Sequence, residues 1–285
     1  MRCKIFTMGI VSFVVSFLAI TVVWSEDRLT LFVGAASKPP VEEIVKLFQK
    51  ETGVKVGVTF GGSGYVLSQM ILAKKGDIYF PGSSDYMERA KREGFVYPDT
   101  EKIVVYLVPA INVQRGNPKN IKGLDDLCRP GVRVAIANPE NVCVGEYAVE
   151  IIEKSLTPSD IKKFKKNIVN YMVSCEKTMM AVALKSVDAV IGWRVFEHWN
   201  PDLVETIPLK TDELVRVGYI PIAISQFTQN RELAQKFIDF VLSEEGSSVF
   251  KKYKYFTLPE EAFNWIGQII PVGGEYQLPK GWVKK

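Results

Sequence analysis

The chain has 285 residues, a formal net charge of +4 and a single histidine, His198. Lysines and acids are interspersed, and the one basic block, Lys162-Lys163-Phe164-Lys165-Lys166, is typical of a solvated helix face. This balance disfavours a nucleic-acid partner, and one histidine excludes a histidine-rich metal site. The length suits two domains.

The first 25 residues differ from the rest of the chain. Met1-Arg2-Cys3-Lys4 is basic, residues 5–24 are almost wholly apolar, and Val23 and Ser25 stand at the usual positions before a cleavage point. We therefore predict a signal peptide at residues 1–25 and a mature periplasmic protein with a net charge near +2. An uncleaved membrane anchor is the alternative, because about 20 apolar residues can span a bilayer. Cys3 lies too early to accept a lipid.

Removal of the leader leaves three cysteines, Cys128, Cys143 and Cys175. Their spacing matches no zinc-binding pattern. In an exported protein an odd number of cysteines permits one disulfide and one free thiol.

After the leader, strand and helix patterns alternate. The first half predicts strands at 29–33, 54–60 and 77–80, and helices from Pro39 to the residue before Gly53, at 64–75 and at 86–93. The second half predicts strands at 132–137 and 187–191, and helices at 147–154, after the Thr157-Pro158 cap, from Ser174 to Leu184 and across 233–253. Two long extended runs, 103–113 and 214–224, each contain a proline.

This alternation is typical of an α/β architecture with helices on both sheet faces. The two extended runs are natural crossovers between two lobes. We therefore predict a discontinuous lobe I, residues 26–107 plus 217–285, and a continuous lobe II, residues 108–216. Open α/β sheets bind ligands at the carboxyl ends of their strands, so a cleft between the lobes is the expected site.

Four strand-to-helix turns are candidates for holding an anion. Ser37 follows Gly34-Ala35-Ala36, and Ser63 lies within Phe60-Gly61-Gly62-Ser63-Gly64. A third turn, 137–147, offers free N–H groups at Val144 and Gly145, and the fourth contains Ser174. Free amides and the positive end of a helix dipole hold an anion without a cationic side chain. One such serine alone is more often a helix cap, but four turns together favour an oxyanion site.

The sequence offers no convincing catalytic motif. Gly61-Gly62-Ser63-Gly64-Tyr65 lacks the last glycine of the G-x-S-x-G nucleophile elbow, and phosphate-loop and dinucleotide fingerprints do not occur. Asp77, Asp85 and Asp188 are possible acids, but single acids at such positions more often cap helices. We therefore predict a binding protein and not an enzyme.

Several longer segments carry a family resemblance. Residues 31–75 place an Ala-Ala-Ser turn before a helix and a second serine at the next turn, and 138–147 resembles the pattern Asp-Pro-x-x-x-Pro-Ala-Gly-x-Tyr. Residues 188–193 are similar to Asp-Ala-Gly-Ile-Val-Tyr. With 77–80, Met87 and 234–256, these segments resemble the periplasmic molybdate-binding proteins of ABC transporters. The resemblance implies the two-lobed type II periplasmic-binding-protein fold, with a mixed sheet in each lobe.

The resemblance also implies the ligand and its contacts. In that family, hydroxyls and backbone amides of both lobes hold molybdate or tungstate, and the corresponding positions here are Ser37, Ser63, Val144, Cys175 and Trp193. The serines match the family, which tends to have alanine, valine and tyrosine at the other three positions. A backbone N–H serves at Val144 and Cys175 whatever the side chain. The Trp193 indole N–H is a donor of different reach, and a core role is its alternative.

Further expectations follow from the same resemblance. Hinge closure traps the anion, and a monomer delivers it to a membrane ABC permease, with no cofactor and no metal held by side chains. Cys143 and Cys175 fall on mouth-forming loops of lobe II, so we expect a disulfide between them and a free Cys128.

Other functions stay open at this point. The ligand could be sulfate, phosphate or ferric iron, although iron would need clustered tyrosines and carboxylates that the five positions lack. An exported sensor domain is a second class, which an uncleaved anchor at 5–24 would favour. A secreted hydrolase is the third.

Overall fold

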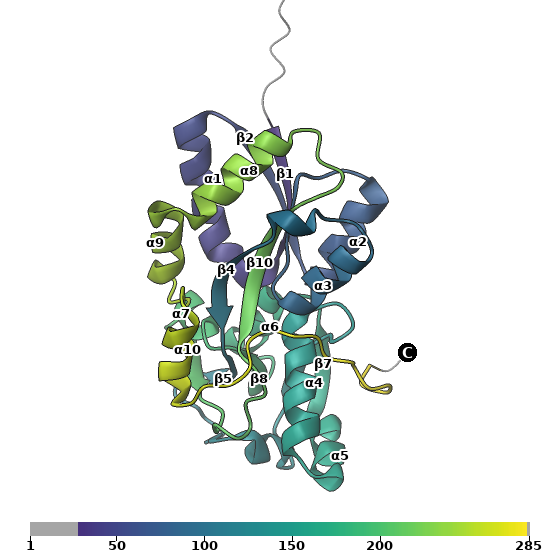
Figure 1. The fold of residues 1–285 in the computed structure, drawn as a ribbon. Coiled ribbons are helices and arrows are strands. Elements are labelled where there is room, and N and C mark those ends of the chain that lie inside the picture. The colour runs from purple at the N-terminus through teal and green to yellow at the C-terminus, as the bar shows by residue number, and fades with distance from the viewer. Residues whose placement is uncertain (1–27, 284–285) are drawn as a thin grey trace, which may run out of the picture.

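The computed structural model describes residues 28–283, and the predicted signal peptide at 1–25 lies outside this range. The described chain forms two lobes stacked end to end, each built on one five-stranded sheet (Figure 1). The strand orders are β2-β1-β3-β10-β4 in lobe I and β7-β6-β8-β5-β9 in lobe II. The predicted α/β fold with two mixed sheets is confirmed.

Lobe I combines the first part of the chain with a late strand. Its strands are β1 (Arg28–Gly34), β2 (Lys55–Gly61), β3 (Ile78–Phe80), β4 (Lys102–Leu107) and β10 (Gly218–Ile224). Its helices are η1 (Ala35–Ser37), α1 (Lys38–Thr52), α2 (Ser63–Ala73), α3 (Ser84–Arg92), η2 (Pro98–Thr100), α8 (Arg231–Leu242) and α9 (Glu244–Lys252). Strand β1 pairs in parallel with β2 and β3, whereas β10 runs antiparallel to β3 and β4. The sheet of lobe I is therefore mixed, with parallel and antiparallel pairs.

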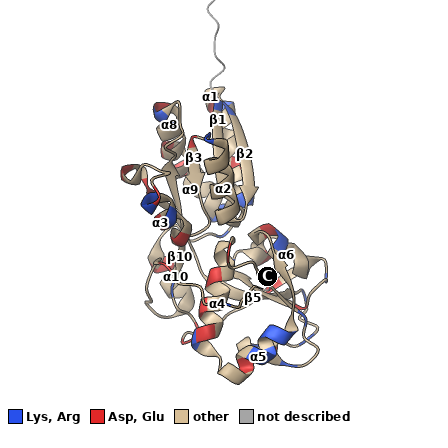
Figure 2. Ribbon diagram, turned by 90° about the vertical axis from the view of Figure 1, so that its right-hand side faces the viewer, with Lys and Arg blue, Asp and Glu red and all other residues tan. Residues whose placement is uncertain are grey.

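Lobe II has the same arrangement. Its strands are β5 (Pro109–Gln114), β6 (Val134–Ala137), β7 (Ile168–Met172), β8 (Ala189–Trp193) and β9 (Val204–Ile207). Its helices are η3 (Leu124–Cys128), α4 (Cys143–Ser155), α5 (Pro158–Asn167), α6 (Cys175–Ala183) and α7 (Phe196–Trp199). Strand β6 is parallel to β7 and β8, and β5 is antiparallel to β8 and β9. The basic block lies on α5, far from lobe I, where Lys162, Lys163 and Lys166 are exposed (Figure 2).

Local signals place several elements where the sequence predicts them. Prolines occupy the first turn of α1, and Gly53 ends the helix in the left-handed conformation with φ of 73°. Thr157 caps α5 by accepting a hydrogen bond from the Asp160 amide. The extended run at 103–113 divides at Val108 into β4 and β5, which belong to different sheets.

The C-terminal end differs from the predicted boundary. Residues 217–285 are all predicted to lie in lobe I, and α10 (Pro259–Ile266) does contact β4 of that lobe, but Trp282 packs against Phe164 of lobe II. The segment after α10 crosses the front of the molecule (Figure 1), and burial of the Trp282 side chain stabilises its end on lobe II.

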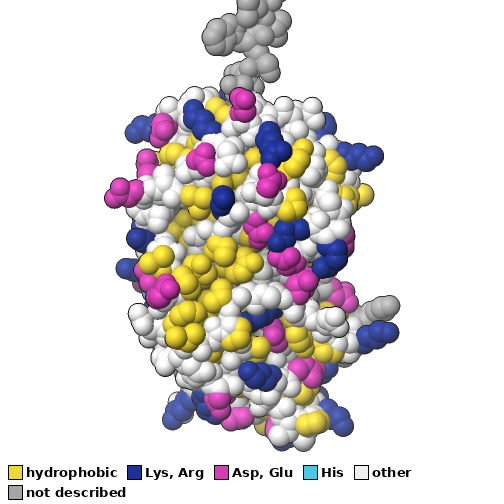
Figure 3. Space-filling view, viewed as in Figure 1, with side chains coloured by type: hydrophobic (Ala, Val, Ile, Leu, Met, Phe, Trp, Pro, Cys, Tyr) yellow, Lys and Arg dark blue, Asp and Glu magenta, His cyan; other side chains and the backbone are white. Residues whose placement is uncertain are grey.

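Apolar side chains gather on the surface over β4 and α10 (Figure 3). Exposed hydrophobic residues include Ile103 on β4, and Leu258 and Ile269 on either side of α10. Among the described residues, no helix combines the length and apolar character that a membrane crossing requires.

Candidate ligand-binding site

Three helices from the two lobes begin at one place in the interface. Ser63 is the first residue of α2, Cys143 of α4 and Cys175 of α6. The sulfurs of Cys143 and Cys175 lie 3.8 Å apart. A methyl group added to Gly82 would lie 2.7 Å from Cys143 Sγ and 3.4 Å from Ser63 Oγ, so lobe I and lobe II meet here. Three positive helix ends therefore face a shared point.

Ser37 lies beside this point. It ends η1, which packs against α6 of lobe II. All five predicted ligand residues are buried: Ser37, Ser63, Val144, Cys175 and Trp193. The structure thus brings Ser63, Cys175 and the start of α4 together, with Ser37 adjacent through α6.

The two lobe I serines do not act as helix caps. Neither α1 nor α2 has a side-chain cap, whereas Ser174 caps α6 by accepting a hydrogen bond from the Lys177 amide. Ser63 Oγ instead accepts from the Gly82 amide at 2.9 Å, and Ser37 Oγ makes only a 3.3 Å bond to the Gly34 carbonyl. The Ser63 hydroxyl keeps its own proton to donate. Uncapped helix ends and buried hydroxyl donors suit an acceptor-only ligand.

At the turn that leads into α4, one of the two backbone amides predicted to be free already has a partner. The Gly145 N–H donates to the Val142 carbonyl at 2.9 Å, so the expectation that Gly145 also offers a free N–H is wrong. No side chain caps α4. Val144 is fully buried, and its role as a backbone donor stays a prediction.

Trp193 ends β8 and lies in the same interface. Its indole Nε1 is buried without a hydrogen-bond partner among the described residues, and so is the hydroxyl of Tyr147. The two rings pack edge to face with centroids 4.9 Å apart. Buried donors without partners are costly, which argues for a bound acceptor that satisfies them.

The predicted disulfide is not formed in the structure. Cys143 and Cys175 are free thiols 3.8 Å apart, whereas a disulfide needs about 2.05 Å. Burial and the neighbouring Cys175 raise the pKa of the Cys143 thiol well above its usual value, which keeps it protonated. Cys128 is also free, as expected, and lies apart on η3.

A cavity of about 470 Å³ opens at the mouth of the interface. Lobe I lines it with Phe60, Gly61, Gly62, Tyr65 and Ser68, and lobe II with Asn138, Asn141, Val173, Ser174, Glu176 and Lys177. None of the five predicted ligand residues lines this cavity. Gly62 and Ser174, which line the cavity, directly precede Ser63 and Cys175 in the chain. The two predicted ligand residues are buried behind the cavity wall.

The lobes are in direct contact between this cavity and the deeper residues. The Gly64 amide donates to the Asn141 carbonyl at 3.0 Å. A methyl group on Gly62 would lie 2.6 Å from the same carbonyl oxygen. Lys38 of α1 pairs with Glu176 of α6 at 2.8 Å. The structure therefore has the two lobes closed on each other.

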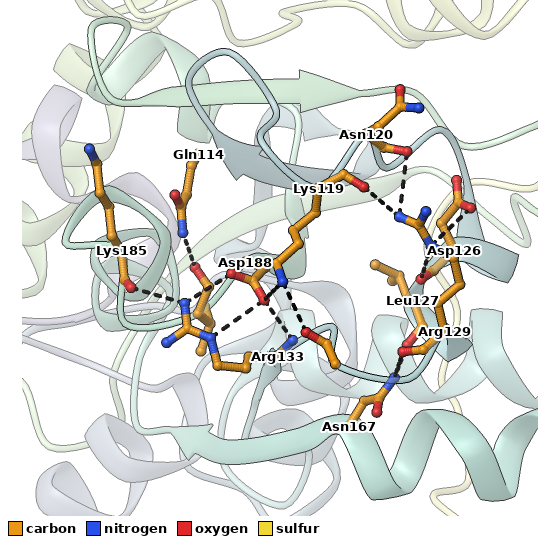
Figure 4. Close-up of polar contacts among 12 residues, drawn as sticks. Gln114, Lys119, Asn120, Asp126, Leu127, Arg129, Arg133, Asn167, Lys185 and Asp188 are labelled. Carbon is orange, nitrogen blue, oxygen red and sulfur yellow. Dashed lines mark hydrogen bonds and ion pairs between the residues drawn. The ribbon is translucent and has the colours of Figure 1, made fainter.

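The three candidate catalytic acids have structural partners. Asp77 accepts from the Thr30 amide and the Thr228 hydroxyl, both at 2.7 Å. Asp188 pairs with Arg133 at 2.9 Å and lies 4.0 Å from Lys119 (Figure 4). Burial raises the pKa of Asp188, but the hydrogen bonds and charge of Arg133 outweigh it and lower the pKa overall.

Asp85 belongs to a buried network that the sequence did not reveal. Arg216 donates to both Asp85 oxygens, at 2.9 and 3.2 Å, and to Glu150 at 2.9 Å. Its guanidinium lies 4.0 Å from the ring centre of Tyr147, the neighbour of Trp193. The only signal in the sequence is one arginine within an apolar extended run.

Comparisons with known proteins agree with this architecture. The chain is 28% identical over 232 residues to a Haemophilus influenzae protein named "Putative binding protein", which covers 80% of this chain and 88% of that protein. It is 23% identical over 245 residues to the molybdate-binding protein ModA of Escherichia coli, covering 81% and 89%. The structure of the sulfate-binding protein SubI from Mycobacterium tuberculosis matches with a TM-score of 0.73 at 18% identity, covering 86% and 93%.

The likeness to solved structures is one of fold: two mixed sheets flanked by helices, as in type II periplasmic binding proteins. The family model for bacterial extracellular solute-binding proteins matches residues 29–255. That range contains both sheets and all five predicted ligand residues. The chain belongs to the bacterial extracellular solute-binding protein family.

Proposed function

We propose that this protein captures a tetrahedral oxyanion, molybdate or tungstate, between its lobes and delivers it to a membrane ABC permease. In this proposal the ligand contacts are the hydroxyls of Ser37 and Ser63, the amides of Val144 and Cys175, and the indole N–H of Trp193. The mature protein acts in the periplasm as a monomer.

The buried, unpartnered indole N–H of Trp193 is the observation that carries the proposal. It lies in an interface where α1, α2 and α4 begin without side-chain caps. An oxyanion accepts hydrogen bonds at every oxygen, so it satisfies such donors without needing a donor of its own. Arg216, the buried cation nearby, is already paired with Asp85 and Glu150.

Closure gives the proposed mechanism. The anion docks on the lobe I hydroxyls, and closure then brings the α4 and α6 ends onto its other oxygens. Lys38–Glu176 and the Gly64–Asn141 hydrogen bond hold the closed form. Relatives named for molybdate and for sulfate support an anion ligand, and they leave sulfate as the second candidate.

A ligand panel tests the proposal. The protein beginning at Glu26 is titrated by calorimetry and thermal unfolding with molybdate, tungstate, sulfate, phosphate and ferric citrate. A ligand at one hundred times its Kd stabilises the fold by about 2.7 kcal/mol. We expect molybdate or tungstate to raise Tm most. A rise with sulfate alone would assign the second candidate, and no rise with any oxyanion would overturn the proposal.

Matched serine variants locate the site in the same panel. Ser63→Ala removes a buried hydroxyl that faces Cys143, and we expect it to raise the Kd at least about fivefold, the effect of one lost hydrogen bond. Ser248→Ala removes an exposed hydroxyl of α9 and should leave the Kd unchanged. Equal affinities for the two variants would exclude Ser63 from the site.

A further inference from the structure

One carboxyl group is enclosed by the meeting of the two lobes. Glu146 lies in the first turn of α4, three residues after Cys143 and one before Tyr147. Residues three apart share a helix face, so Glu146 lies on the side of α4 that carries Cys143, where it meets residues of lobe I.

The Glu146 side chain is half-buried, and one of its two carboxyl oxygens is fully enclosed. Its Oε2 atom is inaccessible to solvent and has no hydrogen bond among the described residues. Within residues 28–283 no cation pairs with it. It lines a cavity of about 170 Å³ together with Asp85 and Tyr86 of α3 in lobe I. The Tyr86 hydroxyl, which has no other partner among the described residues, lies close enough to the carboxyl to lower its pKa, although the two atoms do not meet full hydrogen-bonding geometry.

The charged groups around this cavity are already engaged. From lobe I, α3 contributes Asp85, Tyr86, Arg89 and Arg92. Arg89 pairs with Glu93 at 2.9 Å, and Arg92 pairs with Glu275 of the C-terminal segment at 3.0 Å. These two guanidinium groups are therefore paired with carboxylates other than that of Glu146.

In the described part of the chain, the other elements around the cavity add no unpaired cation. The remaining titratable neighbours are Tyr79 on β3, Glu140 before α4, Cys143 and Tyr147 on α4, Glu275 and Tyr276 after α10, and Arg216 before β10. Arg216 is bound at 2.9 Å by both Asp85 and Glu150. Glu146 is thus left beside the carboxylate of Asp85 with no counter-ion of its own.

Burial of Glu146 depends on closure, because the walls of its cavity come from both lobes and from the C-terminal segment. Burial first, and the charge of Asp85 second, raise the pKa of Glu146 well above its usual range, against a weaker opposing effect of Arg216. When the lobes separate, Tyr86 and Asp85 leave with lobe I and water reaches the carboxyl. Its pKa then returns toward the ordinary value of about 4.3.

We propose that lobe closure takes up one proton at Glu146, so that ligand capture is coupled to protonation and tightens as the pH falls. This inference rests on the proposed oxyanion function, because the ligand is what closes the lobes. The protonated carboxyl adds no negative charge beside the anion, whereas an ionised one would oppose closure.

The sign of the pH dependence follows from the two states. The closed state has the higher pKa, so its advantage is complete below the open-state pKa. Affinity then falls as the pH rises between the open-state and closed-state values. The fall is at most tenfold per pH unit for one proton.

Calorimetry with molybdate tests the coupling. Titrations run between about pH 5.5 and pH 8, well above the open-state pKa, in two buffers with different enthalpies of ionisation. We expect proton uptake of up to one per ligand, and a Kd that rises with pH by up to tenfold per unit. Glu146→Gln cannot ionise, so it should bind without proton uptake and with a flat pH profile.

Glu140→Gln is the matched control. Glu140 lines the same cavity but is exposed, so its variant should keep the wild-type proton uptake. If wild type and Glu146→Gln have equal pH slopes and equal proton uptake, the coupling is wrong while oxyanion binding stands. If no oxyanion binds at any pH, the proposed function and the coupling both fail.

Discussion

At the scale of single residues, Trp193 offers the interface a buried hydrogen-bond donor. Its indole donor is buried and unpartnered, and Tyr147 holds the ring in place. Trp193→Phe keeps the ring packing and removes the donor. Loss of one buried hydrogen bond to an anion should cost about 1.5–3 kcal/mol, which raises the Kd roughly ten- to a hundredfold. The smaller phenyl ring also leaves a cavity at this fully buried position, so we expect some loss of stability in the free protein, which is measured separately from the Kd.

Trp265→Phe is the control, because Trp265 lies on α10 outside the predicted site. Calorimetry gives the Kd, and thermal unfolding gives the stability of each variant. An unchanged Kd for Trp193→Phe would mean that Trp193 is a core residue only.

The cysteines give a second prediction at this scale. The structure has Cys128, Cys143 and Cys175 as buried free thiols, and burial raises the pKa of Cys128 to about 11. We expect little alkylation of the folded protein at neutral pH and three alkylated cysteines after denaturation without reductant. Mass spectrometry of protein starting at Glu26 counts them. A single alkylated cysteine would show that the Cys143–Cys175 disulfide forms in the exported protein.

Residue types at turns were predictable, whereas distant partners were not. Ser63 lies between two glycines and Ser37 lies three residues after Gly34, each at the end of a strand, and this local pattern was sufficient to select them. Arg216 meets Asp85 across 131 positions in the sequence, and Glu146 faces a helix of the other lobe. Such pairs depend on how the lobes meet, which no local pattern records.

At the scale of elements, backbone atoms of one loop from each lobe lie in direct contact. Gly62 precedes α2 with φ of −61° and ψ of 144°, a conformation that alanine also adopts. A methyl group there would lie 2.6 Å from the Asn141 carbonyl oxygen and 2.9 Å from Val142 Cγ2. Gly62→Ala should therefore keep lobe I folded and prevent full closure. We expect at least a tenfold loss of oxyanion affinity with a Tm close to wild type.

Gly123→Ala is the matched control for this prediction. Its added methyl group would meet no atom within 4 Å, so affinity should be unchanged. Calorimetry compares the two variants, and small-angle scattering with ligand compares their closure. A Gly62→Ala protein that binds and closes like wild type would contradict the role of this contact.

Strong periodicity made most elements predictable, and weak periodicity hid the others. Helix α1 has a clear apolar face with prolines at one end and glycine at the other. Strand β7 is only half-buried, and β9 has four residues, so neither has a distinct alternating pattern. Their places in the sheet come from pairing with β6 and β5. Tertiary pairing and not local preference defines them.

At the scale of the whole molecule, the C-terminal segment contacts both lobes. It lies beyond the family match, which ends at residue 255. After α10, Pro271 and Gly273 form backbone hydrogen bonds with Val217 at the crossover between the lobes, both at 2.8 Å. The Gly274 carbonyl accepts from Arg216 at 2.6 Å and from Ser84 of lobe I at 2.9 Å. The segment thus contacts lobe I on its way to lobe II.

The end of this segment is anchored on lobe II. The Trp282 ring is buried against Phe164, and its indole N–H donates to Glu153 at 2.6 Å. Lys165 lies 4.0 Å from the centre of the ring. The sequence predicts this segment in lobe I because it follows the second crossover, the extended run at 214–224. An isolated tryptophan near a terminus does not reveal the surface that buries it.

Removal of residues 268–285 should therefore destabilise the molecule without unfolding either sheet. Loss of the buried Trp282 side chain alone should lower the free energy of unfolding by about 2–3 kcal/mol, and the lost backbone hydrogen bonds add to it. Trp282→Ala in the full chain should show most of the first effect while keeping the bonds of Pro271, Gly273 and Gly274. Chemical denaturation measures both proteins. If truncation cost no more than Trp282→Ala, the crossing of lobe I would contribute nothing, because the lobe II anchor would then account for the whole effect of the segment.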